Sequence, residues 1–411
     1  MLDLFKNAKK AATKLRNLSS REKNEILQAW GQDLWARREE IIEANEKDLA
    51  YGEEIALNPG LMDRLRLNED RIQGMIDGLK VVAGLEDPIG SVDKMVENEN
   101  GLRIGKMRVP IGVIAIIYEA RPNVTVDCAA LTFKSGNALL LRGGKEAIHS
   151  NRKLVEILRK TLEDKNLDPN FVQFVDDPTR ESSKALMEAV GYVDLLIPRG
   201  SASLIRACID QAKVPVLQTG EGNCHIYIDE TADLDMALDI VENAKTQRIG
   251  VCNAMESLLV HKKIGADFLR AFKKIQEKHG IKVHGDPGTC ELLDAEEATE
   301  EDWGREYLAM ECSCKFVDSV DQAIDHINKY STGHSEVIIT NSYENSQKFL
   351  QKVDSACVYV NASSRFTDGG QFGMGAEMGI STQKIHARGP VGLEELTSYK
   401  YIIYGNGQVR K

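Results

Sequence analysis

The sequence has no apolar stretch long enough to cross a lipid bilayer. The longest, around Val113 to Tyr118, is far too short, and the first residues, Met1-Leu-Asp-Leu-Phe-Lys, lack the apolar core of a signal peptide. We therefore expect a cytoplasmic protein with no membrane partner.

An excess of basic charge is also missing. Sixty-three acidic side chains outnumber 52 basic ones, which gives the 411-residue chain a formal net charge of -11. A net negative charge disfavours nucleic acids, so we expect no nucleic-acid partner. Any anionic ligand must be held by local groups.

Metal-binding patterns are absent as well. The eight cysteines are scattered, and the close pair Cys312 and Cys314 has neither a second pair nor a histidine at zinc-ligand spacing. We interpret the cysteines as reduced thiols and predict no metal site.

Nucleotide-binding signatures are missing too, since no Walker A motif occurs. The glycine cluster from Gly369 to Gly379 does not follow a strand and open a helix, as the dinucleotide fingerprint requires. The cluster is also explained by a loop that needs positive φ angles or close backbone approach.

The chain does contain enough hydrophobic residues, 42% of the total, for a large core.

The N-terminal part has the pattern of helices. Ser19-Ser-Arg-Glu22 predicts a capping box, and apolar residues follow it at helical spacing. Those residues are Ile26, Leu27, Trp30, Leu34, Ile41 and Ile42. The first hundred residues therefore read as helices that pack against a core.

From Gly112 onward, short apolar runs alternate with helix-length amphipathic stretches, which is the pattern of buried parallel strands with crossover helices. The first series comprises Val113 to Ile117, Ala138 to Leu141, Phe171 to Val175, Val193 to Ile197 and Val214 to Leu217. A second series has a helix from Leu234 to Ile249 and strands at Leu258 to Val260, Phe316 to Val317, Val337 to Thr340 and Val358 to Val360. The fold class predicted is α/β with two lobes.

Two further segments resemble arms that reach outside a lobe. Asn98 to Pro110, with Gly101 and Gly105, predicts a hairpin, and Lys400 to Tyr404 predicts a late strand.

Cys252 is the first candidate for chemistry. It lies in Gln247-Arg-Ile-Gly-Val-Cys-Asn-Ala-Met255, just past a helix and before an apolar run, where a thiol can be exposed in a cleft. A thiolate is a nucleophile for acyl transfer when nearby groups lower its pKa. On residue type alone, a small buried hydrophobe is the more common interpretation.

Two turns that follow predicted strands are candidate anion sites, Leu141-Arg-Gly-Gly-Lys145 and Ile197-Pro-Arg-Gly-Ser201. Backbone N–H groups at such strand ends can hold a phosphate. Ordinary strand-to-helix turns look the same in sequence.

Eight motifs are spread over most of the chain. They are Val109-Pro-Ile-Gly-Val-Ile, Tyr118-Glu-Ala-Arg-Pro-Asn-Val124, Lys134-Ser-Gly-Asn-Ala-Leu-Leu-Leu-Arg-Gly-Gly-Lys-Glu-Ala147, Leu196-Ile-Pro-Arg-Gly-Ser201, Gly220-Glu-Gly-Asn-Cys-His225, Gly250-Val-Cys-Asn-Ala-Met-Glu256, Arg365-Phe-Thr-Asp-Gly-Gly370 and His386-Ala-Arg-Gly-Pro390. On these motifs the chain resembles, nearly end to end, the aldehyde dehydrogenase superfamily, and within it the branch that reduces an acyl phosphate. The resemblance implies NADPH-dependent reduction of γ-glutamyl phosphate to glutamate 5-semialdehyde through a cysteine thioester, in proline biosynthesis.

The same resemblance implies the lobes and the site. The cofactor-binding domain would comprise 1–96, 111–229 and 361–395, the catalytic domain 230–360, and the oligomerisation arms 97–110 and 396–411. Cys252 would be the nucleophile, with the diphosphate of the cofactor near Gly200 and Ser201 and the nicotinamide ribose near Glu306. A homo-oligomer and association with glutamate 5-kinase are further expectations from the family.

Two departures from the commoner superfamily pattern have physical consequences. Gln218 stands where hydrolytic relatives have a glutamate that activates water, and a carboxamide cannot accept that proton. Glu221 lies near Gln218 in sequence and could accept that proton instead.

The second departure is Lys145, three residues beyond the strand-end Arg142, where NAD-preferring relatives often have a glutamate. Because a lysine attracts a 2'-phosphate, NADP(H) is the expected cofactor. Lys145 could equally be a solvated surface charge.

The substrate's charges require both an acid and guanidinium donors in the pocket. The candidates, each of which could instead form a structural ion pair, are Glu119, Arg121, Arg365 and Arg388. The oxyanion of each step needs fixed donors, for which the backbone N–H of Cys252 and the side chain of Asn123 are candidates. Asn123 is offset from the Trp-Asn pair of common relatives.

Two other interpretations stay open from sequence. One is a hydrolytic or CoA-acylating aldehyde dehydrogenase of the same fold, and the other is a binding or structural protein that has kept the fold without the activity.

Overall fold

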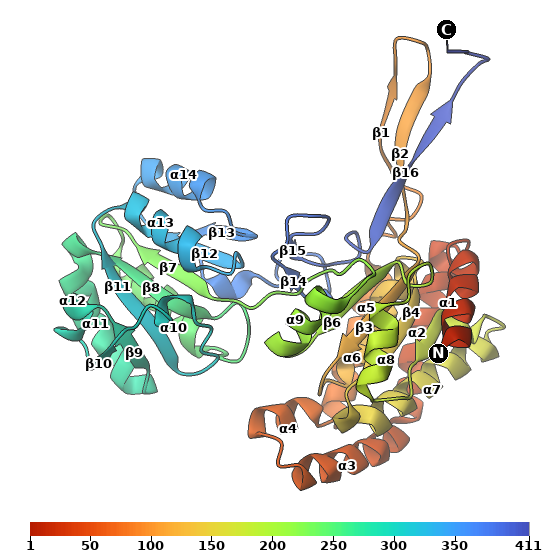
Figure 1. The fold of residues 1–411 in the computed structure, drawn as a ribbon, viewed down its shortest axis with the longest axis horizontal. Helices are drawn as coiled ribbons and strands as arrows, with labels where there is room; N and C mark the ends of the chain where they lie inside the picture. Colours follow the sequence, from red (N-terminus) through yellow and green to blue (C-terminus); the bar gives the residue numbers. More distant parts are fainter. Residues whose placement is uncertain (411) are drawn as a thin grey trace. The chain divides into compact units, whose positions relative to one another are not determined.

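The computed structural model describes residues 1–410, and the chain divides into two compact units (Figure 1). Unit 1 contains Met1–Thr219, Gly373–Gly379 and the chain from Val391 onward, and unit 2 contains Gly220–Phe372 and Ile380–Pro390. Each unit is built on a parallel sheet, which confirms the two α/β lobes expected from the alternation of apolar runs and amphipathic stretches.

The sheet of unit 1 has four parallel strands in the order β5-β4-β3-β6. Their bounds are β3 (Val113–Tyr118), β4 (Ala138–Gly143), β5 (Val172–Phe174) and β6 (Leu195–Arg199). The crossovers contain α6 (Asn123–Lys134), η1 (Lys145–Ala147), α7 (Ile148–Asp164), η2 (Pro169–Phe171) and α8 (Arg180–Met187), and α9 (Ala202–Gln211) follows β6. All residues of β3 and β4 are buried, as expected for strands covered on both faces.

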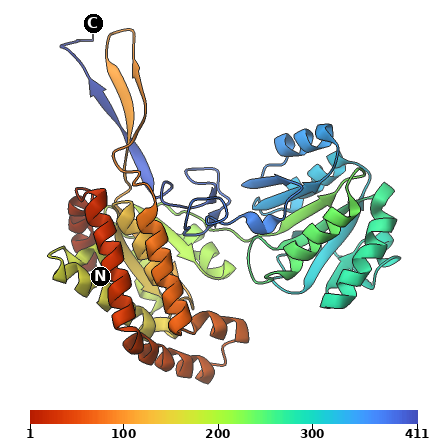
Figure 2. The same ribbon diagram turned by 180° about the vertical axis from the view of Figure 1, so that it is seen from behind.

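Five helices precede this sheet along the chain, and Figure 2 shows them in red to orange. They are α1 (Leu2–Leu15), α2 (Ser20–Ala36), α3 (Arg38–Glu54), α4 (Pro59–Leu65) and α5 (Glu69–Gly84). The predicted capping box is present, because Ser19 accepts from the Glu22 backbone N–H and Glu22 accepts from that of Ser19. The helical face predicted from the sequence is buried except at Ile42, which is half-buried. Helix α2 packs against α5, α6 and α7.

The strand predicted at Val214 to Leu217 is wrong. Only Val216 forms an isolated bridge there, with Leu196 of β6. Pro215 lies in the middle of the segment, and a proline has no N–H to extend a ladder.

A three-stranded antiparallel sheet extends from unit 1 (Figure 1). It is ordered β1-β2-β16, with β1 (Val92–Glu97), β2 (Arg103–Pro110) and β16 (Thr397–Tyr404). The predicted hairpin and late strand are therefore confirmed, although β1 begins before the range 97–110 that was assigned to the arm. Residue 411 of the predicted arm 396–411 lies outside the described residues.

The sheet of unit 2 has seven parallel strands in the order β10-β9-β11-β8-β7-β12-β13. Its strands are β7 (Cys224–Ile228), β8 (Met255–His261), β9 (Lys282–Gly285), β10 (Ala295–Glu297), β11 (Glu311–Val317), β12 (Ser335–Ile339) and β13 (Cys357–Val360). The helices are α10 (Leu234–Thr246), α11 (Lys262–His279), α12 (Pro287–Cys290), α13 (Val320–Tyr330) and α14 (Tyr343–Lys352). Helices α10 and α11 pack in one apolar cluster, and α13 and α14 pack in another.

The division of the chain differs from the predicted ranges 111–229 and 361–395 at β7 and beyond β13. Strand β7 pairs with β8 and β12, so it is a central strand of unit 2 and not part of the first lobe. The turn η4 (Ser364–Phe366) and the small ladder of β14 (Ile380–Ser381) and β15 (Gly389–Pro390) also belong to unit 2. Which unit binds cofactor and which performs catalysis stays a prediction.

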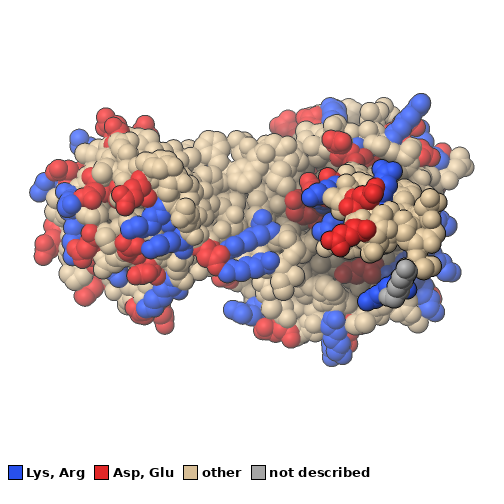
Figure 3. Space-filling model, turned by 90° about the horizontal axis from the view of Figure 1, so that it is seen from above, with Lys and Arg blue, Asp and Glu red and all other residues tan. Residues whose placement is uncertain are grey.

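Within residues 1–410, none of the helices is both long and apolar enough to cross a membrane. Lys and Arg are interspersed with Asp and Glu on the face that Figure 3 shows. Each of the eight cysteines is a free thiol, and six of them are buried.

Candidate active site

Cys252 lies in the turn that leaves α10 and enters β8, at the amino end of that strand. Its side chain is half-buried, whereas six of the other seven cysteines are buried. The sequence context predicted this placement. Such a thiol is accessible to a substrate while its backbone is held by its neighbours.

The segment before β7 lies in direct contact with the Cys252 backbone. Gly222 is so close that a Cβ atom built on it would lie 1.5 Å from the carbonyl oxygen of Cys252. Two residues on, the thiol of Cys224 donates to the same oxygen over 3.1 Å. Position 222 therefore needs a glycine, a requirement that sequence analysis missed although this glycine lies within a motif quoted for the resemblance.

Glu306 reaches the same segment from the loop between η3 (Asp302–Gly304) and β11. Its Oε1 accepts the backbone N–H of Gly222 over 2.8 Å. Burial raises the pKa of the Glu306 carboxyl above its usual range, and the charge of Glu221 acts in the same direction. Glu306, Gly222 and Cys252 therefore form one connected group.

On its other side, the Cys252 turn is tied to η4 and the residue that follows it. The Asn253 side chain donates to the carbonyl of Thr367 over 2.9 Å, and the Ser364 hydroxyl donates to the carbonyl of Asn253 over 2.7 Å. This docking brings Arg365 to the Cys252 turn, where its Nε donates to Oε1 of Gln247 over 2.8 Å. Burial lowers the pKa of the Arg365 guanidinium, while a charged Cys252 sulfur acts in the opposite direction.

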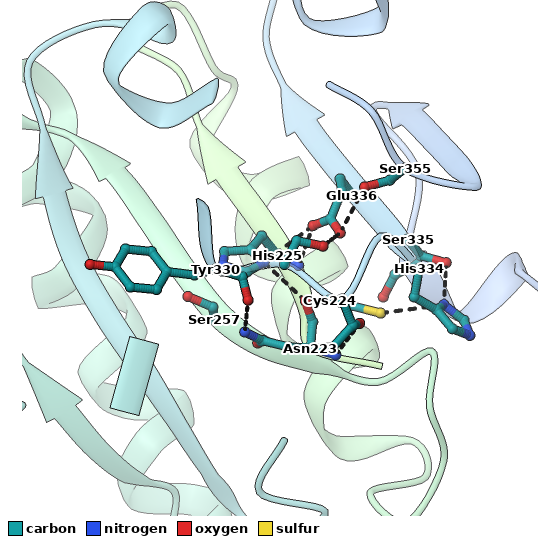
Figure 4. Close-up of polar contacts among 12 residues, drawn as sticks. Asn223, Cys224, His225, Ser257, Tyr330, His334, Ser335, Glu336 and Ser355 are labelled. Carbon is teal, nitrogen blue, oxygen red and sulfur yellow. Dashed lines mark hydrogen bonds and ion pairs between the residues drawn. The ribbon is translucent and has the colours of Figure 1, made fainter. Parts of the chain in front are cut away.

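A buried polar network lies behind this turn, around the amino ends of β7 and β12 (Figure 4). The Cys224 sulfur is 3.7 Å from Nδ1 of His334, which in turn lies 2.8 Å from the Ser335 hydroxyl. Oε2 of Glu336 accepts the His225 backbone N–H over 2.8 Å. Burial raises the pKa of the Cys224 thiol well above its usual value, so Cys224 stays protonated and able to donate.

Arg388 has a partner that the sequence did not predict. It forms an ion pair of 2.9 Å with Oδ1 of Asp354, and its Nη2 donates to the carbonyl of the same residue. Lys384 contacts the same carboxylate. The structure thus assigns the Arg388 side chain a structural ion pair.

The remaining predicted residues belong to unit 1, where they gather at the carboxyl ends of the strands. Glu119 follows β3, and its carboxylate accepts the Ser201 backbone N–H over 2.7 Å at the start of α9. A Cβ on Gly200 would overlap the same carboxylate. An anion therefore already occupies the position predicted for a diphosphate.

Arg142 and Lys145 have different environments at the end of β4. Arg142 is buried and donates to the carbonyls of Pro178 and Thr179, which holds the segment before α8. Lys145 is exposed, with its ammonium 5.8 Å from the ring centroid of Tyr51.

Asn123, the first residue of α6, donates through its side chain to Oδ2 of Asp127 over 2.9 Å. Burial raises the pKa of Asp127 to about 6. Arg121 and Gln218 are half-buried in the same unit. Among the described residues, no group of three or more His, Cys, Asp or Glu is arranged to hold a metal ion.

Comparison with known proteins agrees with this architecture. The sequence pattern of the aldehyde dehydrogenase family matches residues 2–290. The chain is 55% identical to γ-glutamyl phosphate reductase of Clostridium novyi, over 98% of this chain and 97% of that protein. It is 53% identical to γ-glutamyl phosphate reductase of Halothermothrix orenii, over 99% of this chain and 97% of that one.

Solved structures give the same result. The crystal structure of γ-glutamyl phosphate reductase from Thermotoga maritima superimposes with a TM-score of 0.98 at 49% identity, covering 100% of this chain and 99% of that one. An acetylating aldehyde dehydrogenase from Geobacillus thermoglucosidasius shares the fold, with a TM-score of 0.70 at 15% identity over 100% of this chain and 97% of that one. The predicted aldehyde dehydrogenase-like fold is therefore confirmed.

Proposed function

The chain belongs to the aldehyde dehydrogenase family and, within it, to the γ-glutamyl phosphate reductases, and on this premise we propose that Cys252 is its catalytic nucleophile. The reaction is the reduction of γ-glutamyl phosphate to glutamate 5-semialdehyde and phosphate, a step of proline biosynthesis. The observation that carries the role of Cys252 is its half-exposed thiol on a turn whose carbonyl is fixed by Gly222 and Cys224.

In the first step, the Cys252 thiolate attacks the γ-carbonyl carbon of the substrate. A carbon–sulfur bond forms, the carbon–oxygen bond to phosphate breaks, and phosphate leaves with the electron pair. In the second step, the thioester is reduced, and collapse of the thiohemiacetal releases the semialdehyde and regenerates the thiolate.

Both steps develop negative charge on the carbonyl oxygen. We propose the backbone N–H of Cys252 and the side chain of Asn123 as donors to that oxygen. The contacts of Gly222 and Cys224 hold the carbonyl of Cys252, which belongs to the peptide that links Cys252 to Asn253. The Cys252 N–H belongs to the preceding peptide and is proposed as a donor from its position beside the thiol. Asn123 must exchange its bond to Asp127 for this role.

A nicotinamide cofactor fits the residues at the carboxyl ends of the unit 1 strands. The backbone N–H of Ser201 donates to the Glu119 carboxylate, and this contact supports the proposal of an anion site at the start of α9. Gly200 and Ser201 would hold the diphosphate, Lys145 a 2'-phosphate, and Glu306 the nicotinamide ribose. When bound, NADPH supplies hydride to the thioester. Arg142 would act indirectly, by fixing the segment at Pro178.

For the glutamyl and phosphoryl groups we propose Glu119, Arg121, Arg365 and Arg388. Arg365 has the best support, because it is tied to the turn of the nucleophile at Gln247 and Asn253. Arg388 and Glu119 must first leave their partners Asp354 and Ser201. A guanidinium fork suits both carboxylate and phosphate.

Assembly is proposed from the exposed sheet of unit 1. Tyr399, Tyr401 and Ile403 alternate along β16 and are each more than half exposed, which is an apolar stripe that a second copy would cover. Light scattering that reads a monomer at working concentration would remove this proposal.

Association with glutamate 5-kinase and a cytoplasmic location are family-level proposals. The kinase association is supported only by the lability of an acyl phosphate in water.

The test is a phosphate-dependent assay in the reverse direction, with glutamate 5-semialdehyde and NADP or NAD side by side. We expect reduction of NADP in preference to NAD, a requirement for phosphate or arsenate, and no turnover in Cys252→Ala. Turnover without phosphate would favour a hydrolytic aldehyde dehydrogenase, and a requirement for CoA would favour an acylating one.

A further inference from the structure

A fully buried ion pair closes the loop that carries Cys252. Lys245, in the last turn of α10, has a side chain with no exposed surface, as does Glu256 in β8. The ammonium donates to Oε2 of Glu256 over 2.8 Å and to the carbonyl of Met255 over 2.9 Å. Because these residues flank the segment 246–254, one ammonium joins the two ends of the loop at its base.

The same pair also reaches the loop of Glu306. Oε1 of Glu256 accepts the backbone N–H of Leu308 over a longer 3.4 Å. Leu308 has a φ of 53°, in the left-handed region that a leucine rarely adopts, so this contact supports a strained backbone. Leu308 is two residues beyond Glu306, whose carboxylate holds Gly222. One carboxylate therefore links the nucleophile's loop to the Glu306 loop.

Stability does not explain this arrangement. Ala244, Met255 and Cys312 around the pair are buried in the apolar cluster of α10 and α11. A buried ion pair in such surroundings loses as much in desolvation as it gains in attraction, and apolar residues of similar volume often serve equally well. What apolar residues cannot supply is a donor to the Met255 carbonyl and an acceptor for the Leu308 N–H.

We propose that Lys245 and Glu256 are positioning residues that hold the Cys252 loop and the Glu306 loop in one register. Neither residue touches the reacting atoms. The ammonium fixes where β8 begins relative to α10, and the carboxylate fixes the Glu306 loop against that same point. This proposal rests on the catalytic role of Cys252 that is proposed above.

The decisive variant is Lys245→Met combined with Glu256→Leu, which removes both charges at similar volume. The matched control is Lys23→Met with Asp87→Leu, which removes an ion pair of the same length, 2.8 Å, whose lysine is equally buried, in unit 1. On both variants we measure thermal unfolding, kcat, KM for the semialdehyde, and the rate of Cys252 alkylation by iodoacetamide. Both are made in a Cys290→Ser background, because Cys290 is the other half-buried thiol.

We expect the double variant to unfold at nearly the wild-type temperature, with kcat lowered at least tenfold, KM changed less than threefold, and a changed alkylation rate at Cys252. The control keeps wild-type kcat. A double variant with wild-type kcat and alkylation rate would overturn the proposal, and so would one that fails to fold, because the pair would then be a stability device. If the wild-type protein shows no phosphate-dependent turnover, the proposed function fails, while the alkylation rate still decides the role of the pair.

Discussion

The thiol of Cys224 donates to the carbonyl oxygen of Cys252 over 3.1 Å, so one buried cysteine holds the backbone of another that is half-exposed. Cys224 begins β7, whereas Cys252 precedes β8, and the two strands are neighbours in the sheet of unit 2. The pairing of β7 with β8 therefore determines where Cys252 lies.

Replacing Cys224 by alanine removes this donor to the Cys252 carbonyl oxygen. The loss of one such hydrogen bond costs about 0.5–1.5 kcal/mol, and we expect part of that cost to appear as movement of the Cys252 turn. The prediction for Cys224→Ala is a kcat lowered about tenfold, equal to about 1.4 kcal/mol of barrier. Cys224→Ser, which keeps a donor, should retain most of the activity. Equal activity in the two variants would show that the donor is unimportant.

Gly222→Ala tests the close approach to Cys252. Since its Cβ would lie 1.5 Å from a carbonyl oxygen, the Cys252 turn or the segment before β7 must shift. We expect kcat to fall about a hundredfold, or about 2.7 kcal/mol. Gly74→Ala is the matched control, because Gly74 is exposed in α5 with no heavy atom within 4 Å of its added Cβ. That substitution should keep activity and raise the free energy of unfolding by about 0.5–1 kcal/mol.

The sequence predicts those features that depend on neighbouring residues. Its apolar runs predicted most strands and the turn that holds Cys252, because burial and local periodicity leave their pattern in neighbouring residues. They did not predict that β7 belongs to unit 2, since pairing partners of parallel strands lie far away in the chain. The strand predicted at Val214 to Leu217 was wrong, because Pro215 has no N–H for a ladder and this outweighs the apolar pattern of the segment.

Side-chain contacts could be predicted from the sequence even less well than strand pairing. Nothing near Arg388 in sequence indicates that Asp354 neutralises it, and nothing near Lys245 indicates burial against Glu256. Gly222 lies within a motif of the resemblance, yet its reason, contact with the Cys252 carbonyl, exists only in three dimensions. Glu306 was assigned through the resemblance alone, and the structure adds its bond to Gly222.

Gln218→Glu restores the side chain that hydrolytic relatives use to activate water. A carboxylate can accept a proton from water where a carboxamide cannot, so we expect phosphate-independent oxidation of glutamate 5-semialdehyde to appear. The measurement is NADPH formation in phosphate-free buffer, at least tenfold above the wild-type background. Glu221→Gln is the companion variant. Loss of residual phosphate-independent turnover in that variant would identify Glu221 as the substitute base.

His326 should make the protein sensitive to acid. Burial lowers its pKa to about 3, and the charges of His225, Lys315 and Lys329 act in the same direction. Because the pKa is near 6.5 when unfolded, the unfolded chain binds the proton more readily, and stability present above that pH is lost as the pH falls. At about pH 5 the loss amounts to about 2 kcal/mol.

His326→Phe keeps a ring against Tyr330, which is 4.5 Å away between centroids, and cannot be protonated. We expect urea unfolding of this variant to lose less stability between about pH 7 and pH 5 than that of the wild type, by about 2 kcal/mol. Equal losses in both proteins would mean that His326 titrates normally and that its burial has no consequence.

We propose that Cys252 carries the acyl group between phosphate and the cofactor. To test this role, stoichiometric enzyme is mixed with NADP and glutamate 5-semialdehyde in phosphate-free buffer, and NADPH is followed in a stopped-flow instrument. The prediction is a burst of one NADPH per chain, then near-arrest as the thioester accumulates, and steady turnover once phosphate is added, with neither phase in Cys252→Ala. Steady turnover before phosphate is added, or a burst in Cys252→Ala, would rule out this role for Cys252.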